Sequence, residues 1–492
     1  MKGIFIKMDK TKENNNKNIT IKLAYLFITL LFAMPSIIFL IKNRSVSTFV
    51  YYCTYFFKKN IYTYENVIEA LIFITIIISL FLLYFLILKY RDKIFKSIKS
   101  IAIYICIIAI LFTIMIPSTS QDVYSYIANG WIESNYHQNP YYTSVLDIAT
   151  EEQSISPMFI KIARCWIDEP VIYGPVWTFI CNILTSFSFG NIDIALFIFK
   201  IASLVAFLGS TLLIYKITKK KIFTLMFALN PLILFEGLAN VHNDIFLILF
   251  ILLSIYFITR KKNLFISVAF LAIATGIKYL SILLLPFILI YYLRNETVKN
   301  RIIKSILYGI EFIAIIIGFY LIYLKDINVF AGIFIQQEKY SRSLLLIINN
   351  LFLGNEKALS IIKITLLSIF SIAYIIVVFK LLFNKNLNDL KLSKIFRKYN
   401  IFLMLFTFVL VTNFNAWYII WLFGTLMWQK PINIKVAIYA SIGALLPYAI
   451  TYATKEDGQI VGVPYFCIMI LIMSIPLIKY ALRNMKRKKL EN

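Results

Sequence analysis

Long apolar runs separated by short polar links dominate the chain. The runs at residues 67–88, 302–324 and 361–383 are nearly free of charge. A helix of about 18 or more apolar residues is long enough to cross the hydrocarbon core of a bilayer. Because backbone groups in lipid must be satisfied within the segment, these runs are expected to be helical. The pattern predicts an all-α polytopic membrane protein.

The same pattern predicts about 12–14 transmembrane helices within one domain at residues 23–481. Residues 173–189 are assigned to an amphipathic or re-entrant helix at the outer surface, because a crossing there would place the next basic link outside. Residues 266–292 are assigned to a hairpin of short helices with Lys278 near its tip, and a single tilted helix remains an alternative. The predicted crossings lie at 23–41, 66–89, 99–116, 193–215, 221–238, 243–259, 264–276, 278–292, 302–324, 359–383, 400–412, 416–429, 434–454 and 463–481.

Charge placement predicts the orientation. Hydrophobic residues make up 60% of the chain and charged residues 15%, and the net charge is +26. Lys and Arg collect in links that fall on one side, at 89–93, 216–221, 260–262, 294–304, 385–398 and 486–489. The positive-inside rule makes this side cytoplasmic, together with a polar tail at 1–22 and a basic tail at 482–492. The placement argues against nucleic-acid binding and predicts a multi-pass protein of the cell membrane.

The polar residues that could take part in chemistry lie on the opposite, outer side of the predicted membrane. A first large outer loop with surface helices is expected at 117–192 and a second at 325–358, and both histidines, His137 and His242, fall on this side. No glycine-rich nucleotide loop occurs, and the five cysteines lack metal-ligand spacing. Any active site is therefore expected on the non-cytoplasmic face.

Asp122 is the first candidate for chemistry. It follows the outer end of the apolar run at 99–116. A carboxylate that is partly desolvated at the membrane boundary gains basicity and suits a general base. The alternative is a residue that begins and stabilises a helix.

A second candidate lies at the start of the next outward-facing segment, where Asn240, His242, Asn243 and Asp244 precede an apolar run. Polar side chains there are costly unless they face a water-filled cavity. A histidine at a helix N-terminus suits an anion such as phosphate. Helix capping, with His242 merely at the interface, is the alternative.

Aromatic and basic residues form the remaining candidates. Trp417, Tyr418 and Trp421 fit an interfacial aromatic belt, or alternatively a surface on which a sugar stacks. Arg342 in the second outer loop could neutralise phosphate or simply be solvated. Lys278 stands out because lysine is rare at membrane depth.

Several short motifs, in order, resemble the GT-C superfamily of glycosyltransferases, and within it the bacterial alpha-mannosyltransferases that use polyprenol phosphomannose. They span about 300 residues and lie at 121–130, 139–141, 173–177, 229–232, 242–244, 277–279 and 416–421. The resemblance implies a GT-C-type bundle and an inverting transfer of a hexose, with mannose expected, from a polyprenyl-phosphate donor to an outer-face glycan or glycolipid.

The resemblance also implies roles for particular residues. Asp122 would be the catalytic base, and His242, Lys278 and Arg342 would bind the donor phosphate. The substrate would be bound by Tyr126, Asn243, Asp244, Trp417 and Tyr418. No nucleotide or other cofactor is expected. No metal is expected either, because Gln121 stands where many members have a second acid beside Asp122.

Two other functions remain open. A transporter or flippase of lipid-linked sugars would carry charged residues along the bundle interior, and often repeated halves. A polymerase- or ligase-like protein would share the large outer loops but use a pyrophosphate donor. The bond made and the donor consumed separate these possibilities.

Overall fold

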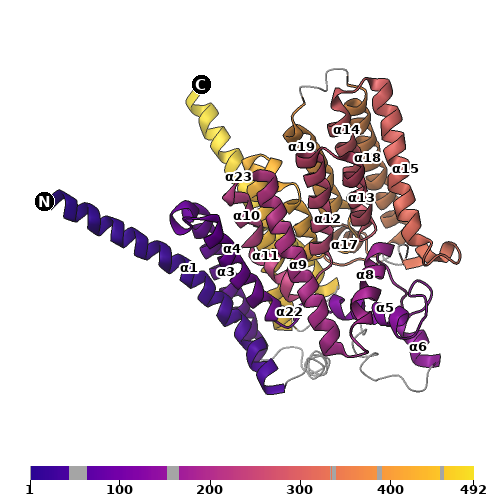
Figure 1. Cartoon of the computed structure of the whole chain (residues 1–492), viewed down its shortest axis with the longest axis horizontal. Coiled ribbons are helices and arrows are strands. Elements are labelled where there is room, and N and C mark those ends of the chain that lie inside the picture. Colours follow the sequence, from indigo (N-terminus) through magenta and orange to yellow (C-terminus); the bar gives the residue numbers. More distant parts are fainter. Residues whose placement is uncertain are drawn as a thin grey trace.

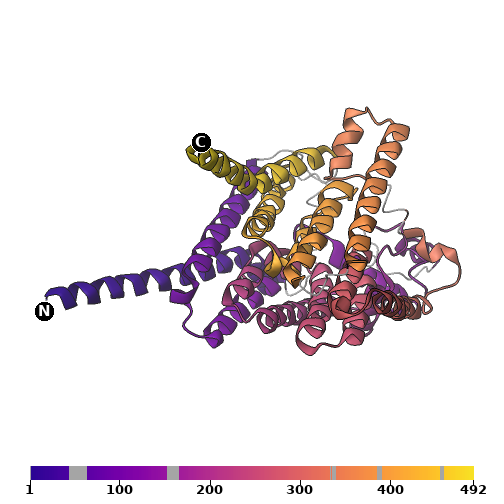
Figure 2. The same ribbon diagram turned by 90° about the horizontal axis from the view of Figure 1, so that it is seen from above.

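A computed structural model describes residues 2–43, 64–151, 166–332, 334, 339–384, 390–454 and 459–491. Within these ranges every regular element is a helix, and one isolated parallel bridge pairs Ser341 with Asn413. Most of the described helices share a buried apolar core that runs from α1 to α23, and a smaller apolar cluster contains Tyr141, Tyr320 and Tyr323. Figure 1 shows the bundle, and Figure 2 shows the start of α1 projecting away from it. The predicted all-α polytopic fold is confirmed.

Seven of the described segments are long and apolar enough to cross a membrane. They belong to α1 (Lys2–Asn43), α3 (Tyr64–Ile94), α9 (Ile192–Thr218), α15 (Val298–Tyr320), α18 (Glu356–Leu382), α21 with α22 (Pro431–Leu445, Tyr448–Thr454) and α23 (Gln459–Glu491). Large apolar side chains such as Ile313 and Ile372 remain exposed on α15 and α18, as expected of surfaces that face lipid.

The other predicted crossings fall on shorter or broken helices. One pair, Lys221–Ala228 with Pro231–Ala239, is bent by 52° and counts as an eighth span if it is continuous. Asn230 and Pro231 cause the break: the Asn230 side chain caps α11 (Pro231–Leu234), and proline occupies its first turn. The shorter helices are α4 (Ile98–Ile114), α12 with η2 (Asp244–Tyr256, Phe257–Lys261), α13 (Leu264–Thr275), η3 with α14 and η4 (Tyr279–Leu284, Leu285–Tyr292, Leu293–Asn295) and α19 with η7 (Leu392–Leu405, Phe406–Leu410).

The predicted crossing at 416–429 differs most from the structure. It consists of three short pieces, η8 (Ala416–Ile419), α20 (Ile420–Phe423) and η9 (Leu426–Trp428). Trp417 and Trp421 are buried in the protein. The aromatic-belt interpretation is therefore wrong, because these rings pack against the interior of the bundle.

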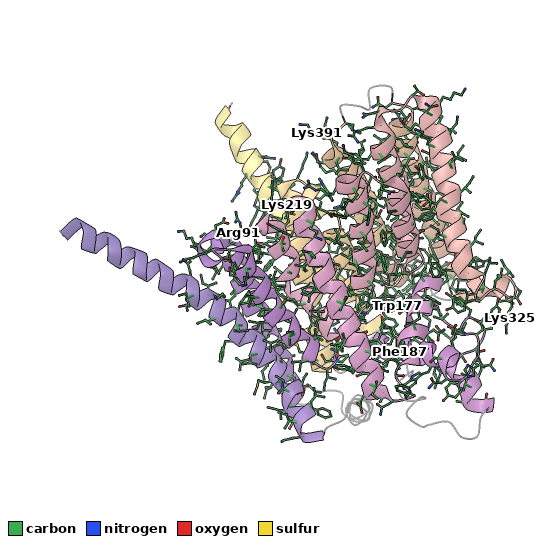
Figure 3. All side chains as sticks on the ribbon, viewed as in Figure 1. Arg91, Trp177, Phe187, Lys219, Lys325 and Lys391 are labelled. Carbon is green, nitrogen blue, oxygen red and sulfur yellow. The ribbon has the colours of Figure 1, made fainter. Side chains whose placement is uncertain are left out.

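Short helices of the predicted first outer loop gather at one end of the bundle, which is the lower end in Figure 1. They are α5 (Asp122–Ser134), α6 (Val145–Glu151) and α8 (Pro175–Ser186), while η5 (Ile327–Phe330) and α17 (Leu344–Leu351) belong to the second predicted loop. In Figure 3, Arg91, Lys219 and Lys391 lie toward the opposite end from Phe187 and Lys325.

Candidate functional site

The loop that carries His242 is built from an irregular stretch of backbone. After α11 the chain forms the π-helix η1 (Phe235–Ala239), and Val241 adopts the left-handed conformation with φ of 60°. This conformation is costly for a β-branched residue and often marks functional sites. The backbone N–H of His242 donates to the carbonyl of Glu236, 3.0 Å away. The strained turn thus folds His242 back over η1.

Asn240 joins this turn to the segment that precedes Asp122. Its Oδ1 accepts from the N–H of Ser118 at 3.2 Å, and its Nδ2 donates to Thr119 Oγ1 at 2.7 Å and Glu236 Oε2 at 3.0 Å. Asp122 is the first residue of α5, but the N-cap is Gln121 and no side chain makes a capping hydrogen bond, so the helix-capping alternative for Asp122 is wrong. The sequence-distant candidates Asp122 and His242 are therefore brought together by a buried amide.

His242 lies between two carboxylates. Its Nδ1 is 3.5 Å from Asp122 Oδ2, and its Nε2 is 3.2 Å from Glu236 Oε2. Its ring stacks on Trp417, with ring centroids 3.6 Å apart. His242 and Glu236 are fully buried, whereas the Asp122 side chain keeps 17% of its exposure. Of the three groups, Asp122 is therefore the one that a substrate can reach.

Electrostatics favour a charged pair of Asp122 and His242. Burial opposes the imidazolium, but the Asp122 and Glu236 carboxylates outweigh it and raise the pKa of His242 to about 9. Burial also opposes the Asp122 carboxylate, yet hydrogen bonding with His242 and the charges of His242 and Lys278 lower the pKa of Asp122. The expectation that desolvation raises the basicity of Asp122 is therefore wrong, because cationic neighbours outweigh burial.

A second ion pair lies on the adjacent helix start. Lys278 Nζ donates to both carboxylate oxygens of Asp244 at 2.8 Å, and the indole N–H of Trp421 donates to Asp244 Oδ1. Lys278 also lies 5.0 Å from the ring centroid of Tyr418, which stacks on Trp421. Four of the sequence candidates thus form one contact network.

A pair of glycines holds the Lys278 turn against α8. The Gly276 carbonyl accepts from the N–H groups of Val176 and Trp177 at 2.9 and 3.2 Å. A Cβ on Gly174 would lie 2.3 Å from that carbonyl oxygen, so only glycine allows this approach. The motifs at 173–177 and 277–279 therefore meet in space.

Tyr126 and Arg342 complete the set of candidates. Tyr126 is buried, and its ring packs edge-on against Tyr173 and Trp177. Arg342 is 9% exposed, has a φ of 49° and lies 5.4 Å from the Tyr465 ring. Electrostatic interactions reach from Arg342 to Tyr418 and Tyr448, which also interact with Asp122, Asp244 or Glu236.

Asn243 is buried, and both of its side-chain amide atoms lack a hydrogen-bond partner among the described residues. Leaving such a group unsatisfied costs about 1–3 kcal/mol. The ring nitrogens of His242 differ, because each faces a carboxylate. The Asn243 amide therefore favours a site that binds a polar ligand. Over the same ranges, no set of three or more His, Cys, Asp and Glu side chains is placed to hold a metal ion.

Sequence reasoning missed Glu236 and Lys200, which lie inside predicted crossings. Lys200 is buried on α9, and its Nζ donates to the carbonyls of Met115, Leu238 and Ala239. Met115 follows α4, and the other two residues end η1, so Lys200 joins the segments that lead to Asp122 and His242. The sequence did carry a signal for both residues, because a charged side chain inside a predicted crossing usually indicates a functional site.

Comparison with known proteins agrees with the motifs. Residues 54–294 match the family described as "Alpha-(1->6)-mannopyranosyltransferase, N-terminal domain". The chain is 24% identical over 179 residues to "Alpha-(1->6)-mannopyranosyltransferase A" of Corynebacterium glutamicum, a match that covers 35% of this chain and 34% of the relative. No solved structure matches the chain.

The family match contains Asp122, Glu236, His242, Asp244 and Lys278, whereas Arg342 and the aromatic residues at 417–421 lie beyond it. The part of the site with most of its charge is thus the part that the family describes. The resemblance to GT-C-type mannosyltransferases is therefore confirmed: over residues 54–294 this chain is similar to the alpha-(1->6)-mannopyranosyltransferases.

Proposed function

We propose that the chain is a membrane glycosyltransferase that moves a hexose, mannose by family similarity, from a polyprenyl-phosphate donor to a glycan or glycolipid at the non-cytoplasmic face. The family match supports mannosyl transfer. The observation that carries the proposal is the Asp122–His242–Glu236 cluster, in which one partly accessible carboxylate is held beside a buried imidazole.

The reaction uses Asp122 as the general base. The acceptor hydroxyl oxygen bonds to the anomeric carbon from the face opposite the phosphate, and its proton passes to the Asp122 carboxylate. The bond from the anomeric carbon to the phosphate oxygen breaks, and its electron pair stays on the phosphate. The result is one new glycosidic bond, inverted configuration and free polyprenyl phosphate.

Cationic side chains are proposed to stabilise the phosphate as it leaves. Lys278, Arg342 and His242 are the groups proposed to stabilise the charge that develops on the phosphate. Asp244 and Trp421 orient Lys278, while Asn243 and Tyr126 supply buried polar atoms for the sugar. Trp417, which stacks on His242, and Tyr418, which stacks on Trp421, are the aromatic residues proposed to border the sugar.

Substitution of Asp122 tests the proposal. Membranes with the wild type or Asp122→Asn receive labelled polyprenol phosphomannose and a mannoside acceptor, and the glycosidic product is measured. We expect Asp122→Asn to lower transfer by about 10²–10⁴-fold, the usual contribution of a general base. Asp168→Asn, an exposed acid of the same outer segment, is the matched control and should keep full activity.

Two outcomes would contradict parts of this assignment. Full transfer by a normally expressed Asp122→Asn variant would exclude Asp122 as the base. Movement of the lipid-linked sugar across liposomes by the wild type, with no new glycosidic bond, would replace transfer with a flippase activity.

A further inference from the structure

A polar hollow lies at the far end of α5 from Asp122. It has a volume of about 530 Å³, which falls in the range typical of small-molecule sites. Its walls come from the end of α5, the following turn, α8 and the residues after α15. The lining residues are Glu133, Ser134, His137, Gln138, Asn139, Asn182, Ser186, Ile322 and Tyr323.

The chemistry of the walls suits a neutral polyhydroxyl ligand. Carboxylate, amide, hydroxyl and imidazole groups all line the hollow, and none of its nine lining residues is Lys or Arg. A phosphate or another anion would therefore meet no permanent cation. Tyr323 donates to Glu133 Oε2 at 3.1 Å, and burial raises the pKa of Glu133 despite hydrogen bonding with Tyr323 and Asn182. Sugar hydroxyls can both donate to and accept from such groups.

Contacts behind the walls and between the lining residues hold the hollow in place. Helices α5 and α8 approach closely at Gly130, where a Cβ would lie 2.6 Å from Thr185 Oγ1. The Trp131 indole donates to Ser188 Oγ at 2.8 Å. Among the lining residues themselves, Asn139 Nδ2 donates to the Tyr323 carbonyl at 2.7 Å. A preorganised hollow loses less entropy when it binds a ligand.

The turn after α5 adds two polar side chains, those of His137 and Gln138, to the wall of the hollow. His137 adopts the left-handed conformation with φ of 54°, and the Gln138 N–H donates to the Ile132 carbonyl at 2.9 Å. A non-glycine residue in this conformation is uncommon and worth a functional explanation. The strained turn places two polar side chains on the wall of the hollow.

Helix α5 sets the distance between the hollow and the proposed base. Asp122 is its first residue and Glu133 lies in its last turn. At about 1.5 Å of rise per residue, the two are roughly 16 Å apart along the helix. This separation exceeds one sugar unit and is bridged by several linked hexoses. Figure 1 shows α5 and α8 together at the end of the bundle that holds the short outer helices.

We propose that this hollow is a distal subsite for the acceptor, which holds hexose units of an oligosaccharide whose terminal hydroxyl reaches Asp122. The inference rests on the proposed function for its role, but the binding of a neutral oligosaccharide can be measured without transfer. The subsite makes the enzyme prefer an acceptor several hexoses long over a single sugar or a disaccharide.

The experiment uses the full chain, purified in nanodiscs, with an alpha-(1->6)-linked mannohexaose as the probe. Binding is measured by titration calorimetry for the wild type, Glu133→Gln, Asn182→Ala and Asn295→Ala. Asn295 is exposed and far from the hollow in the sequence, so its variant is the matched control. We expect the first two variants to weaken the Kd about tenfold, equivalent to one hydrogen bond to a charged or buried group, and the control to bind as the wild type does.

Transfer kinetics give the second readout. In Glu133→Gln and Asn182→Ala, the KM for mannohexaose should rise about tenfold, while the KM for mannobiose and both kcat values stay at the wild-type level. Wild-type protein that binds no mannohexaose, or variants with unchanged Kd and KM, would overturn the subsite. Binding that both variants weaken, in a wild type that transfers no hexose, would retain the subsite and overturn the proposed function instead.

Discussion

The imidazole Nδ1 of His242 lies 3.5 Å from Oδ2 of Asp122, where two distant parts of the chain meet. Glu236 holds the opposite side of the same ring, with its Oε2 3.2 Å from Nε2. The pair therefore combines an accessible carboxylate with a buried imidazolium. Its protonation state controls both the charge of the site and the contact between the two segments.

The pH dependence of transfer should follow this pair. The pKa of His242 is raised from 6.5 to about 9, so the imidazolium contributes stability fully below pH 6.5 and loses it as the pH rises through about 9. The lowered pKa of Asp122 keeps its contribution at neutral pH and loses it only in acid, below the usual range of that carboxyl. We expect transfer and thermal stability to fall together near pH 9.

His242→Gln tests this assignment. The variant should lose the alkaline fall in transfer, and the acid limb should move to higher pH because Asp122 has lost its main cationic partner. Rates are measured across pH in membranes of both proteins. An alkaline fall that persists unchanged in His242→Gln would show that another group titrates.

Glu236→Gln should change the pH profile without removing the site. Gln keeps an oxygen that can accept from Asn240 Nδ2, which now donates at 3.0 Å, but it removes one of the two charges that hold the imidazolium. We expect the alkaline limb to move from about pH 9 toward the ordinary pKa of histidine, with a smaller loss of rate than in Asp122→Asn. Glu356→Gln, at the exposed start of α18, is the control for a lost acid. An unshifted profile would contradict a role for Glu236 in charging His242.

The sequence predicted much of this site because its residues stand out where they occur. Asp122, His242 and Lys278 interrupt or border apolar runs, and each contacts another candidate in the structure. Glu236 and Lys200 were overlooked because they lie inside runs that are otherwise apolar. Their roles depend on the packing of α9 against η1, a long-range contact that hydrophobic periodicity does not encode.

Two other features also required three-dimensional information. The pKa of Asp122 moves down rather than up because His242 and Lys278 are near it, and spacing along the chain gives no distance between them. The tryptophans at 417 and 421 fit a membrane belt by composition, yet they are buried against His242 and Asp244. The number of crossings was hard to predict from the sequence because some helices break, such as the one interrupted at Asn230 and Pro231.

Lys278 and Asp244 should be strongly coupled. Lys278→Met leaves the Asp244 carboxylate buried without its cation, and breaking a buried pair costs about 3–5 kcal/mol. Asp244→Asn combined with Lys278→Met should recover most of the thermal stability, measured by unfolding of the purified protein. If Lys278 binds the donor phosphate, the double variant still has a raised KM for polyprenol phosphomannose. A double variant with wild-type donor KM would make Lys278 a purely structural partner.

Lys200 should act as a positioning residue. Lys200→Met leaves the carbonyls of Met115, Leu238 and Ala239 without their donor, at a cost of about 1–3 kcal/mol for each one left unsatisfied. We expect a lower unfolding temperature and a fall in kcat, with the donor KM less affected, because Asp122 and His242 lose their alignment. Lys216→Met, on the exposed side of the same helix, is the control. Equal effects of the two substitutions would contradict the positioning role.

Gly174→Ala should separate α8 from the turn that carries Lys278. The new Cβ would lie 2.3 Å from the Gly276 carbonyl oxygen, and backbone atoms on both sides leave no flexible group to yield. Overpacking of this kind typically costs about 1–3 kcal/mol, and relief would displace the N–H groups that now bind Gly276. Transfer and unfolding temperature are compared with those of Gly309→Ala, whose Cβ would meet nothing within 4 Å. We expect Gly174→Ala to lower both the transfer rate and the unfolding temperature. Gly309→Ala should keep both at the wild-type level, because alanine favours the helix. Equal behaviour of the two variants would mean that close contact at Gly174 is not needed to hold Lys278 at the site.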